Sequence, residues 1–271
     1  MNNILLLILL FLLLIISGRR GLKTFIAIYL NIFLLVFLIF LISCQINPFL
    51  PTIAICLIIS MIILFFLNGR NKKTIAAFLS VIIILIIFIT ITMICIRKTY
   101  IQGYTEETIE SIGYINYETG LNMYNISTSA ILIGLIGTIT DTAIAISSAL
   151  YEVHQNNKNL SFKELFNSGM NIGKDILGTT TNTLFFAYLG SYMTIFIYFQ
   201  DFRYSFIDII NSKLFAQEFV NIILSGLSSI MIIPIASYIT SFICLYERND
   251  YNEKNEYRLR RQRNTSRGQR S

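Results

Sequence analysis

Long apolar runs constrain the fold of this sequence more than any other feature. Several are close to 20 residues, which is the length that a helix needs to cross roughly 30 Å of hydrocarbon at about 1.5 Å per residue. Only 13% of the 271 residues are charged, whereas soluble domains carry about 25%. The runs do not alternate with a period of two, as barrel strands do. The sequence therefore predicts an all-α fold, a polytopic transmembrane helical bundle.

Seven segments are predicted to cross the membrane, at residues 4–17, 24–43, 51–67, 74–95, 127–150, 176–199 and 219–246. The first is short, and if it does not span, the N-terminus moves to the other side while the later segments keep their orientation. Three regions follow from these segments: a two-helix N-terminal part at 1–50, a main transmembrane domain at 51–246, and a basic tail at 247–271 that is expected to be disordered.

The distribution of basic residues predicts the orientation. Of the 21 lysines and arginines, 17 lie in the loops 18–23, 68–73 and 151–175 and in the tail. The positive-inside rule places these regions in the cytoplasm, with the N-terminus outside. The tail is interpreted as an anchor against anionic lipid headgroups, and no nucleic-acid partner is expected.

The connection between the fifth and sixth segments carries a helix signal. Ser161 and Glu164 form a capping box, and apolar residues follow at helical spacing at Phe162, Leu165, Phe166 and Met170. This pattern predicts a short amphipathic helix along the inner membrane surface. Gly169 and Gly173 are expected to end it, so that the chain turns into the next segment. His154, which precedes this helix, is expected to be solvated.

Asp141 lies inside the apolar fifth segment. A carboxylate in the membrane is costly, about 2.5–3.5 kcal/mol on insertion scales, so it is expected to face protein or water. The sixth segment offers polar partners for it. The candidate intramembrane polar or proton-relay site comprises Asp141, Thr138, Thr142, Ser148, Lys174, Asp175, Asn182 and Thr183. Close helix packing is expected at Gly134, Gly137, Gly178 and Gly190.

Two interpretations of this site remain open: a proton or ion relay at Asp141, or a structural polar cluster that locks the two helices together. Other chemistries lack their signatures. His154 is the only histidine and the four cysteines form no CxxC pair, so no metal site is expected. Phosphate-binding and dinucleotide-binding loops and hydrolase motifs are absent, so neither a cofactor nor enzymatic activity is predicted.

Two stretches carry a family resemblance: GTITDTAIAISSALYE at 137–152, followed by SGMNIGKDILGTTTNTLFFAYLG at 168–190. They resemble the YibE/F-like family of bacterial membrane proteins, and the resemblance covers residues 51–244, most strongly 134–190. It implies a multi-pass protein of the bacterial plasma membrane. Such proteins look like members of pairs, so the implied partners besides the lipid bilayer are a sibling YibE/F-type subunit or further copies of this chain.

The order of the last five segments is similar, by analogy, to one half of resistance-nodulation-division exporters and Sec accessory subunits, which couple protons through intramembrane carboxylates. This chain departs from them because its outer loop, 96–127, is too short for a large external domain. The analogy favours a proton-coupled, transporter-like or export subunit. The alternative is a non-transporting scaffold or accessory subunit of another membrane complex.

Overall fold

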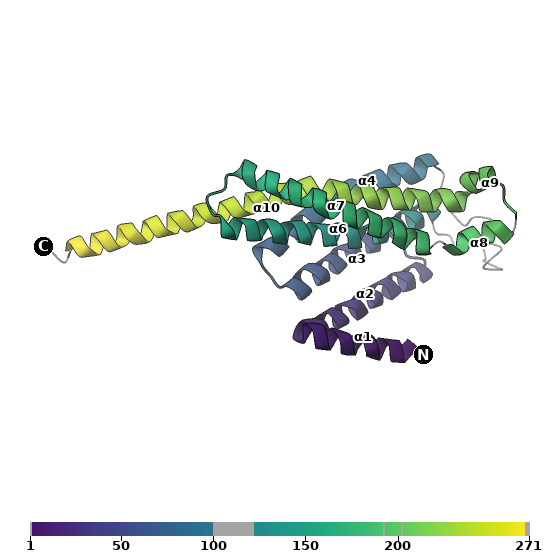
Figure 1. The fold of residues 1–271 in the computed structure, drawn as a ribbon, viewed down its shortest axis with the longest axis horizontal. Coiled ribbons are helices and arrows are strands. Elements are labelled where there is room, and N and C mark those ends of the chain that lie inside the picture. The colour runs from purple at the N-terminus through teal and green to yellow at the C-terminus, as the bar shows by residue number, and fades with distance from the viewer. Residues whose placement is uncertain (1, 100–121, 192, 202, 269–271) are drawn as a thin grey trace.

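The computed structural model describes residues 2–99, 122–191, 193–201 and 203–268, and no strand occurs among them. The elements are α1 (Asn2–Ser17), α2 (Arg19–Ser43), α3 (Phe49–Met61), the π-helix η1 (Ile62–Leu67), α4 (Lys72–Thr99), α6 (Met123–Asn156), α7 (Phe162–Ser191), α8 (Met193–Asp201), α9 (Phe206–Asn211) and α10 (Lys213–Gly268), as Figure 1 shows. The predicted all-α class is confirmed. The disorder expected for the tail is wrong, because α10 continues through it to Gly268.

Five of the described helical stretches are long and apolar enough to cross a membrane: Arg19–Ser43, Phe49–Leu67, Lys72–Thr99, Tyr124–Asn156 and Phe215–Tyr246. They match five of the predicted segments and indicate a multi-pass membrane protein. The remaining two segments are helical but do not belong to this group. The first, α1, has only 16 residues, and the sixth is divided between α7 and α8.

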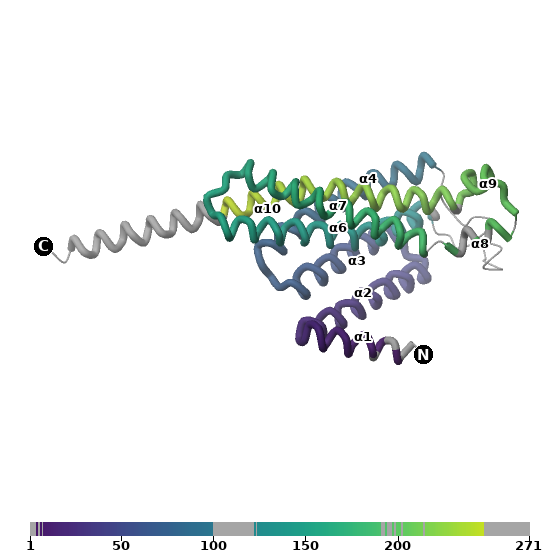
Figure 2. The backbone as a smooth tube through the Cα atoms, viewed as in Figure 1, coloured from purple at the N-terminus to yellow at the C-terminus, as the bar shows by residue number. Residues whose placement is uncertain are grey.

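The core lies where α4, α6 and α10 pack together. Its largest fully buried side chains include Phe88 of α4 and Leu132, Leu135 and Ile139 of α6. The hairpin of α1 and α2 stands to one side of these helices (Figure 2). The arrangement leaves α6 as the central helix, with α7 and α10 beside it.

Helix α7 runs antiparallel to both α6 and α10. Near one end, a Cβ on Gly169 of α7 would touch Leu150 of α6 and Ser237 of α10. Near the other end, the Tyr188 hydroxyl of α7 shares a 2.9 Å hydrogen bond with the Ser225 hydroxyl of α10. Helices α6 and α10 therefore point the same way. Helix α7, which lies between them in the sequence, runs in the opposite direction (Figure 1).

The prediction that Gly169 and Gly173 end a separate surface helix is wrong, because α7 is continuous from Phe162 to Ser191. A Cβ on Gly169 would lie 2.6 Å from Ser237 Oγ, and one on Gly173 would overlap Ile233 Cγ2. The glycines thus allow α7 to approach α10 more closely than side chains would permit. The expected surface helix is the first part of α7, and it is packed against α10.

The prediction that His154 is solvated is also wrong, since its side chain is only 4% exposed. Helix α6 extends to Asn156, six residues past the predicted end of the fifth segment. His154 lies one turn beyond Leu150, which is packed with Leu165 and Cys244 where α6, α7 and α10 meet. The continuation of α6 therefore carries His154 into this junction.

The predicted capping box at the start of α7 is confirmed. The Ser161 backbone N–H and hydroxyl each donate to Glu164 Oε2 at 2.8 Å, and the Glu164 N–H donates to Ser161 Oγ at 3.4 Å. These bonds to the carboxylate lower the pKa of Glu164 below its ordinary value. The carboxylate therefore stabilises the folded chain above the unfolded pKa, and this contribution is lost as pH falls through the folded pKa.

We expect Glu164→Gln to lower the thermal unfolding midpoint in detergent at pH 7. The difference from the wild type should shrink below about pH 4, where an unperturbed glutamate is itself protonated. Glu152→Gln is the matched control, because Glu152 is exposed and accepts no hydrogen bond from the residues described. A difference between Glu164→Gln and the wild type that stays constant from pH 7 to pH 3 would contradict the prediction.

Candidate functional site

A groove of about 530 Å³ opens between α6 and α7, and among the described residues that line it Asp141 is the only charged one. Its lining consists of Gly134, Gly137, Thr138, Asp141, Thr142, Ala145, Ile176, Thr179, Thr180, Thr183 and Leu184. The residues from α6 recur at intervals of three or four and so share one face of that helix. The small side chains on this face leave the space that larger ones would fill.

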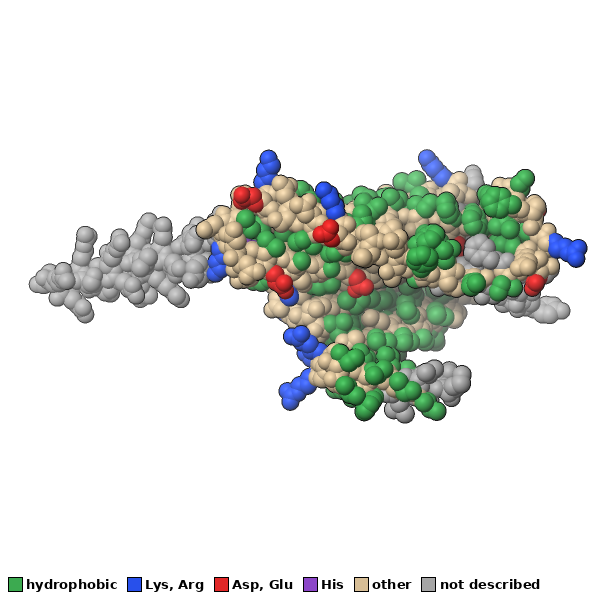
Figure 3. Space-filling model, viewed as in Figure 1, with side chains coloured by type: hydrophobic (Ala, Val, Ile, Leu, Met, Phe, Trp, Pro, Cys, Tyr) green, Lys and Arg blue, Asp and Glu red, His purple; other side chains and the backbone are tan. Residues whose placement is uncertain are grey.

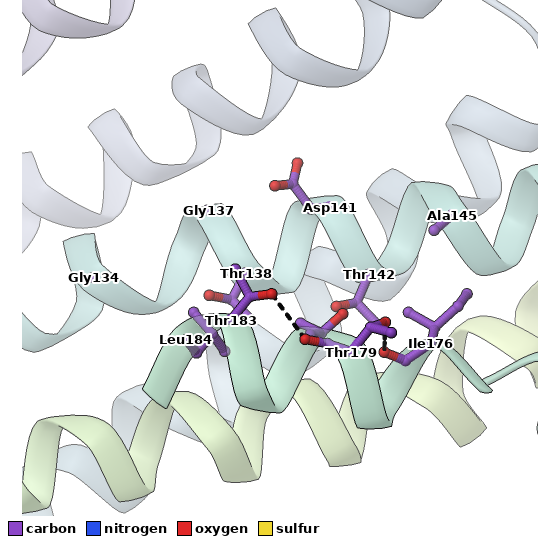
Figure 4. Close-up of a pocket in the computed structure, with 11 residues that line it drawn as sticks. Gly134, Gly137, Thr138, Asp141, Thr142, Ala145, Ile176, Thr179, Thr183 and Leu184 are labelled. Atoms are coloured by element: carbon purple, nitrogen blue, oxygen red, sulfur yellow. Dashed lines mark hydrogen bonds between the residues drawn. The ribbon is translucent and has the colours of Figure 1, made fainter. Parts of the chain in front are cut away.

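The α7 wall of the groove is made largely of threonines. The Thr179 hydroxyl donates to the Ile176 carbonyl and the Thr183 hydroxyl to the Thr179 carbonyl, each at 2.9 Å (Figure 4). Each donor is therefore used within α7, while the hydroxyl oxygen retains acceptor capacity. Such a wall can accept hydrogen bonds from water in the groove.

The Asp141 side chain is exposed, and Figure 4 shows its carboxylate pointing away from α7. It makes no hydrogen bond or ion pair with the residues that the structure describes. The expected partners do not reach it: Lys174 and Asn182 are exposed and lie outside the groove lining. The carboxylate therefore borders open space and is not held in a hydrogen-bonded cluster.

The structure brings together part of the predicted site. Thr138 and Thr142 are buried and line the groove with Asp141, as do Gly134, Gly137 and Thr183. The others lie outside its lining: Ser148, Lys174, Asp175, Gly178, Asn182 and Gly190. Three of these are charged or amide side chains exposed on α7, namely Lys174, Asp175 and Asn182.

Buried hydroxyls on α10 are a feature that the sequence analysis missed. They belong to Ser225, Ser228, Ser229, Ser237, Thr240 and Ser241, each at most 1% exposed. Thr240 Oγ1 donates to Ser147 Oγ of α6 at 2.9 Å. The signal was present in the sequence as two groups of small hydroxyl residues within the apolar run, at 225–229 and 237–241, each with spacings of three or four. These small residues let α6 and α7 approach α10 closely.

No group of three or more histidine, cysteine, aspartate or glutamate side chains converges in the described parts of the chain. The expectation that the protein holds no metal and no cofactor stays a prediction. The chemistry that the groove itself offers is that of one carboxylate at its border, pointing away from the threonines of α7. Such a carboxylate can take up and release a proton.

Comparison with known families bears on the identity of the chain. The family model described as YibE/F-like protein matches residues 5–245, a longer stretch than the 51–244 on which the resemblance rested. No curated protein matches the chain, and no solved structure matches it. The matched stretch includes four of the five apolar helices in full, the fifth except for its last residue, and both walls of the groove. The chain belongs to the YibE/F-like family.

Proposed function

We propose that this chain is a proton-coupled, transporter-like or export subunit of the bacterial plasma membrane, in which Asp141 takes up and releases protons. One observation carries the proposal: an exposed carboxylate borders an open groove within an apolar, membrane-length helix. Asp141 precedes Leu150 by nine residues, about 13 Å along the helix. A carboxylate at that depth needs water or a partner, and the groove gives water a route to it.

The helix directions support a crossing by α7. Helices α6 and α10 point the same way and are each apolar enough to span, so the chain between them must return across the bilayer. Helix α7 makes this return, although polar residues reduce its hydropathy. With α1 included, this gives the predicted seven spans. The basic loops and tail support a cytoplasmic C-terminus and an external N-terminus.

We expect Asp141→Asn to reduce proton uptake by at least about 10-fold, because an amide cannot exchange the proton that a positioned carboxylate transfers. The test uses the full chain in liposomes that contain a pH-sensitive dye, with an inward proton-driving potential set by potassium and valinomycin. Asp141→Glu keeps a carboxylate and should retain uptake, while Glu152→Gln controls for the loss of an exposed acid.

The proposal fails if Asp141→Asn inserts, elutes as the wild type does from a sizing column, and takes up protons equally well. Uptake by the wild type that is no faster than in protein-free liposomes would instead favour the second candidate function, a non-transporting scaffold or accessory subunit of another membrane complex. The exposed polar residues Lys174, Asp175 and Asn182 on α7 support this alternative, since they offer a surface for another protein. Neither candidate assigns a chemical reaction to the chain.

A further inference from the structure

A polar line runs along α7 on the side opposite its contact with α10. It consists of Asn171, Asp175, Gly178 and Asn182, which we call the outer seam of α7. All four are exposed, and their spacing of four, three and four residues keeps them on one helical face. The buried Gly169 and Gly173 lie on the opposite face, against α10. The helix thus turns its most polar side away from its own core.

Contacts between α7 and α6 show how deep in the membrane the outer seam lies. A Cβ on Gly169 would lie 3.3 Å from Leu150 Cδ2, and a Cβ on Gly134 would lie 3.5 Å from the Tyr188 hydroxyl. Residues 169–188 of α7 therefore lie level with residues 134–150 of α6. That part of α6 belongs to a membrane-length apolar stretch, Tyr124–Asn156. The outer seam is consequently at the depth of the hydrocarbon.

Contact of the outer seam with lipid hydrocarbon would be energetically unfavourable. Lys174 adjoins the seam and is exposed, as Asp175 is, and charged side chains at membrane depth are expensive unless they face protein or water. None of Lys174, Asp175 and Asn182 makes a hydrogen bond or ion pair within the described ranges. Farther along α7 the exposed side chains become apolar, with Phe185 47% and Phe186 68% exposed. Only this part of α7, around Phe185 and Phe186, has the apolar surface that lipid contact favours.

In Figure 3, acidic and basic side chains interrupt the hydrophobic surface over α6 and α7. We propose that a second copy of this chain covers the outer seam, so that two α7 helices pack side by side in a symmetric dimer. The inference goes beyond proton transfer at Asp141 and does not depend on it.

The symmetry of a membrane dimer explains why a second copy fits. Two copies inserted in the same orientation are related by a two-fold axis normal to the bilayer, so each residue meets others at its own depth. Lys174 and Asp175 differ in depth by about 1.5 Å. Lys174 of one copy therefore meets Asp175 of the other, and the pair occurs twice. The surface is complementary in charge to itself.

The remaining seam residues suit the same contact. Asn182 meets Asn182 of the other copy, and two amides can satisfy each other because each has both donors and an acceptor. Gly178 lies one turn from each of Asp175 and Asn182, and a Cβ there would meet no atom of another described helix within 4 Å. Its missing side chain lets the second helix approach closely.

Cysteine cross-linking tests the proposed dimer. The background is the full chain with Cys44→Ser and Cys95→Ser, which removes the two cysteines that are not buried. Asn182→Cys is oxidised in liposomes at a low protein-to-lipid ratio and run on a non-reducing gel. We expect a disulfide-linked dimer at a yield at least about 10-fold above that of Ile86→Cys, because only symmetric seam positions meet their counterparts. Ile86 is a matched control on α4, 60% exposed.

Charge exchange provides the second test. Asp175→Lys should lower the Asn182→Cys cross-linking yield, because it brings like charges together, and adding Lys174→Asp should restore the yield. Restoration shows that charge pairing, and not misfolding, caused the loss. Equal yields at Asn182→Cys and Ile86→Cys would overturn the proposal, as would the absence of a disulfide-linked dimer from Asn182→Cys. Asp141→Asn should dimerise like the wild type, so failure of the relay and failure of the dimer are separable.

Discussion

Gly173→Ala is expected to weaken the packing of α7 on α10 and lower the stability of the bundle. The added Cβ would overlap Ile233 Cγ2, a branched side chain whose residue is 4% exposed. Overpacking of this kind costs about 1–3 kcal/mol. Gly169→Ala should act in the same direction, because its Cβ would lie 2.6 Å from Ser237 Oγ. The measurement is the midpoint of thermal unfolding of the purified chain in detergent.

Gly226→Ala is the matched control. Gly226 lies in α10, and a Cβ there would meet no atom of another helix within 4 Å in the part of the chain that the structure describes. Its replacement should be neutral or raise stability by up to about 1 kcal/mol through helix propensity. The two substitutions add the same methyl group, so opposite signs would isolate packing from propensity. An unchanged midpoint for Gly173→Ala would contradict the close approach of α7 and α10.

The hydrogen bond from Thr240 to Ser147 should stabilise the contact between α10 and α6. The Oγ atoms are 2.9 Å apart, and the two residues are 1% and 0% exposed. Thr240→Val or Ser147→Ala alone should cost about 1 kcal/mol, because each leaves a buried hydroxyl without its partner. The double variant should cost less than the sum of the two, since neither hydroxyl then remains.

A double-mutant cycle on the free energy of unfolding in detergent measures this coupling. Ser241→Ala serves as the control. Ser241 is 0% exposed, and its hydroxyl has no hydrogen-bond partner in the described residues. Its removal should be close to neutral. Costs for Ser147→Ala and Thr240→Val that simply add would show that the two hydroxyls do not support each other.

The sequence was sufficient to predict the fold class, because apolar runs of membrane length leave few alternatives. It also predicted the capping box at Ser161 and Glu164, since the motif depends only on neighbouring residues. It failed at Gly169 and Gly173. Glycine has a low helix propensity, which suggested a break, whereas the approach of α10 requires that no side chain be present at either position.

The candidate site was predictable only in part, for a geometric reason. Spacing shows which residues share a helical face, so Gly134, Gly137 and Asp141 could be grouped on α6. It does not show how α7 is rotated about its axis relative to α6. The contact of Gly173 with α10 sets that rotation, and it turns Asn182 outward, away from Asp141. The buried serines of α10 were missed because single hydroxyls change the hydropathy of an apolar run very little.

The antiparallel course of α7 has a consequence for how the chain is inserted during synthesis. As a proposed span, α7 carries Lys174 and Asp175, which disfavour its partitioning from the translocon into lipid. The surface that receives its glycine face belongs to α10, and α10 is synthesised later. We therefore expect α7 to remain beside α6 until α10 has been synthesised. If α7 crosses the membrane as proposed, we expect residues 123–246 to enter the bilayer as one cooperative unit, in which packing against α10 stabilises the inserted α7.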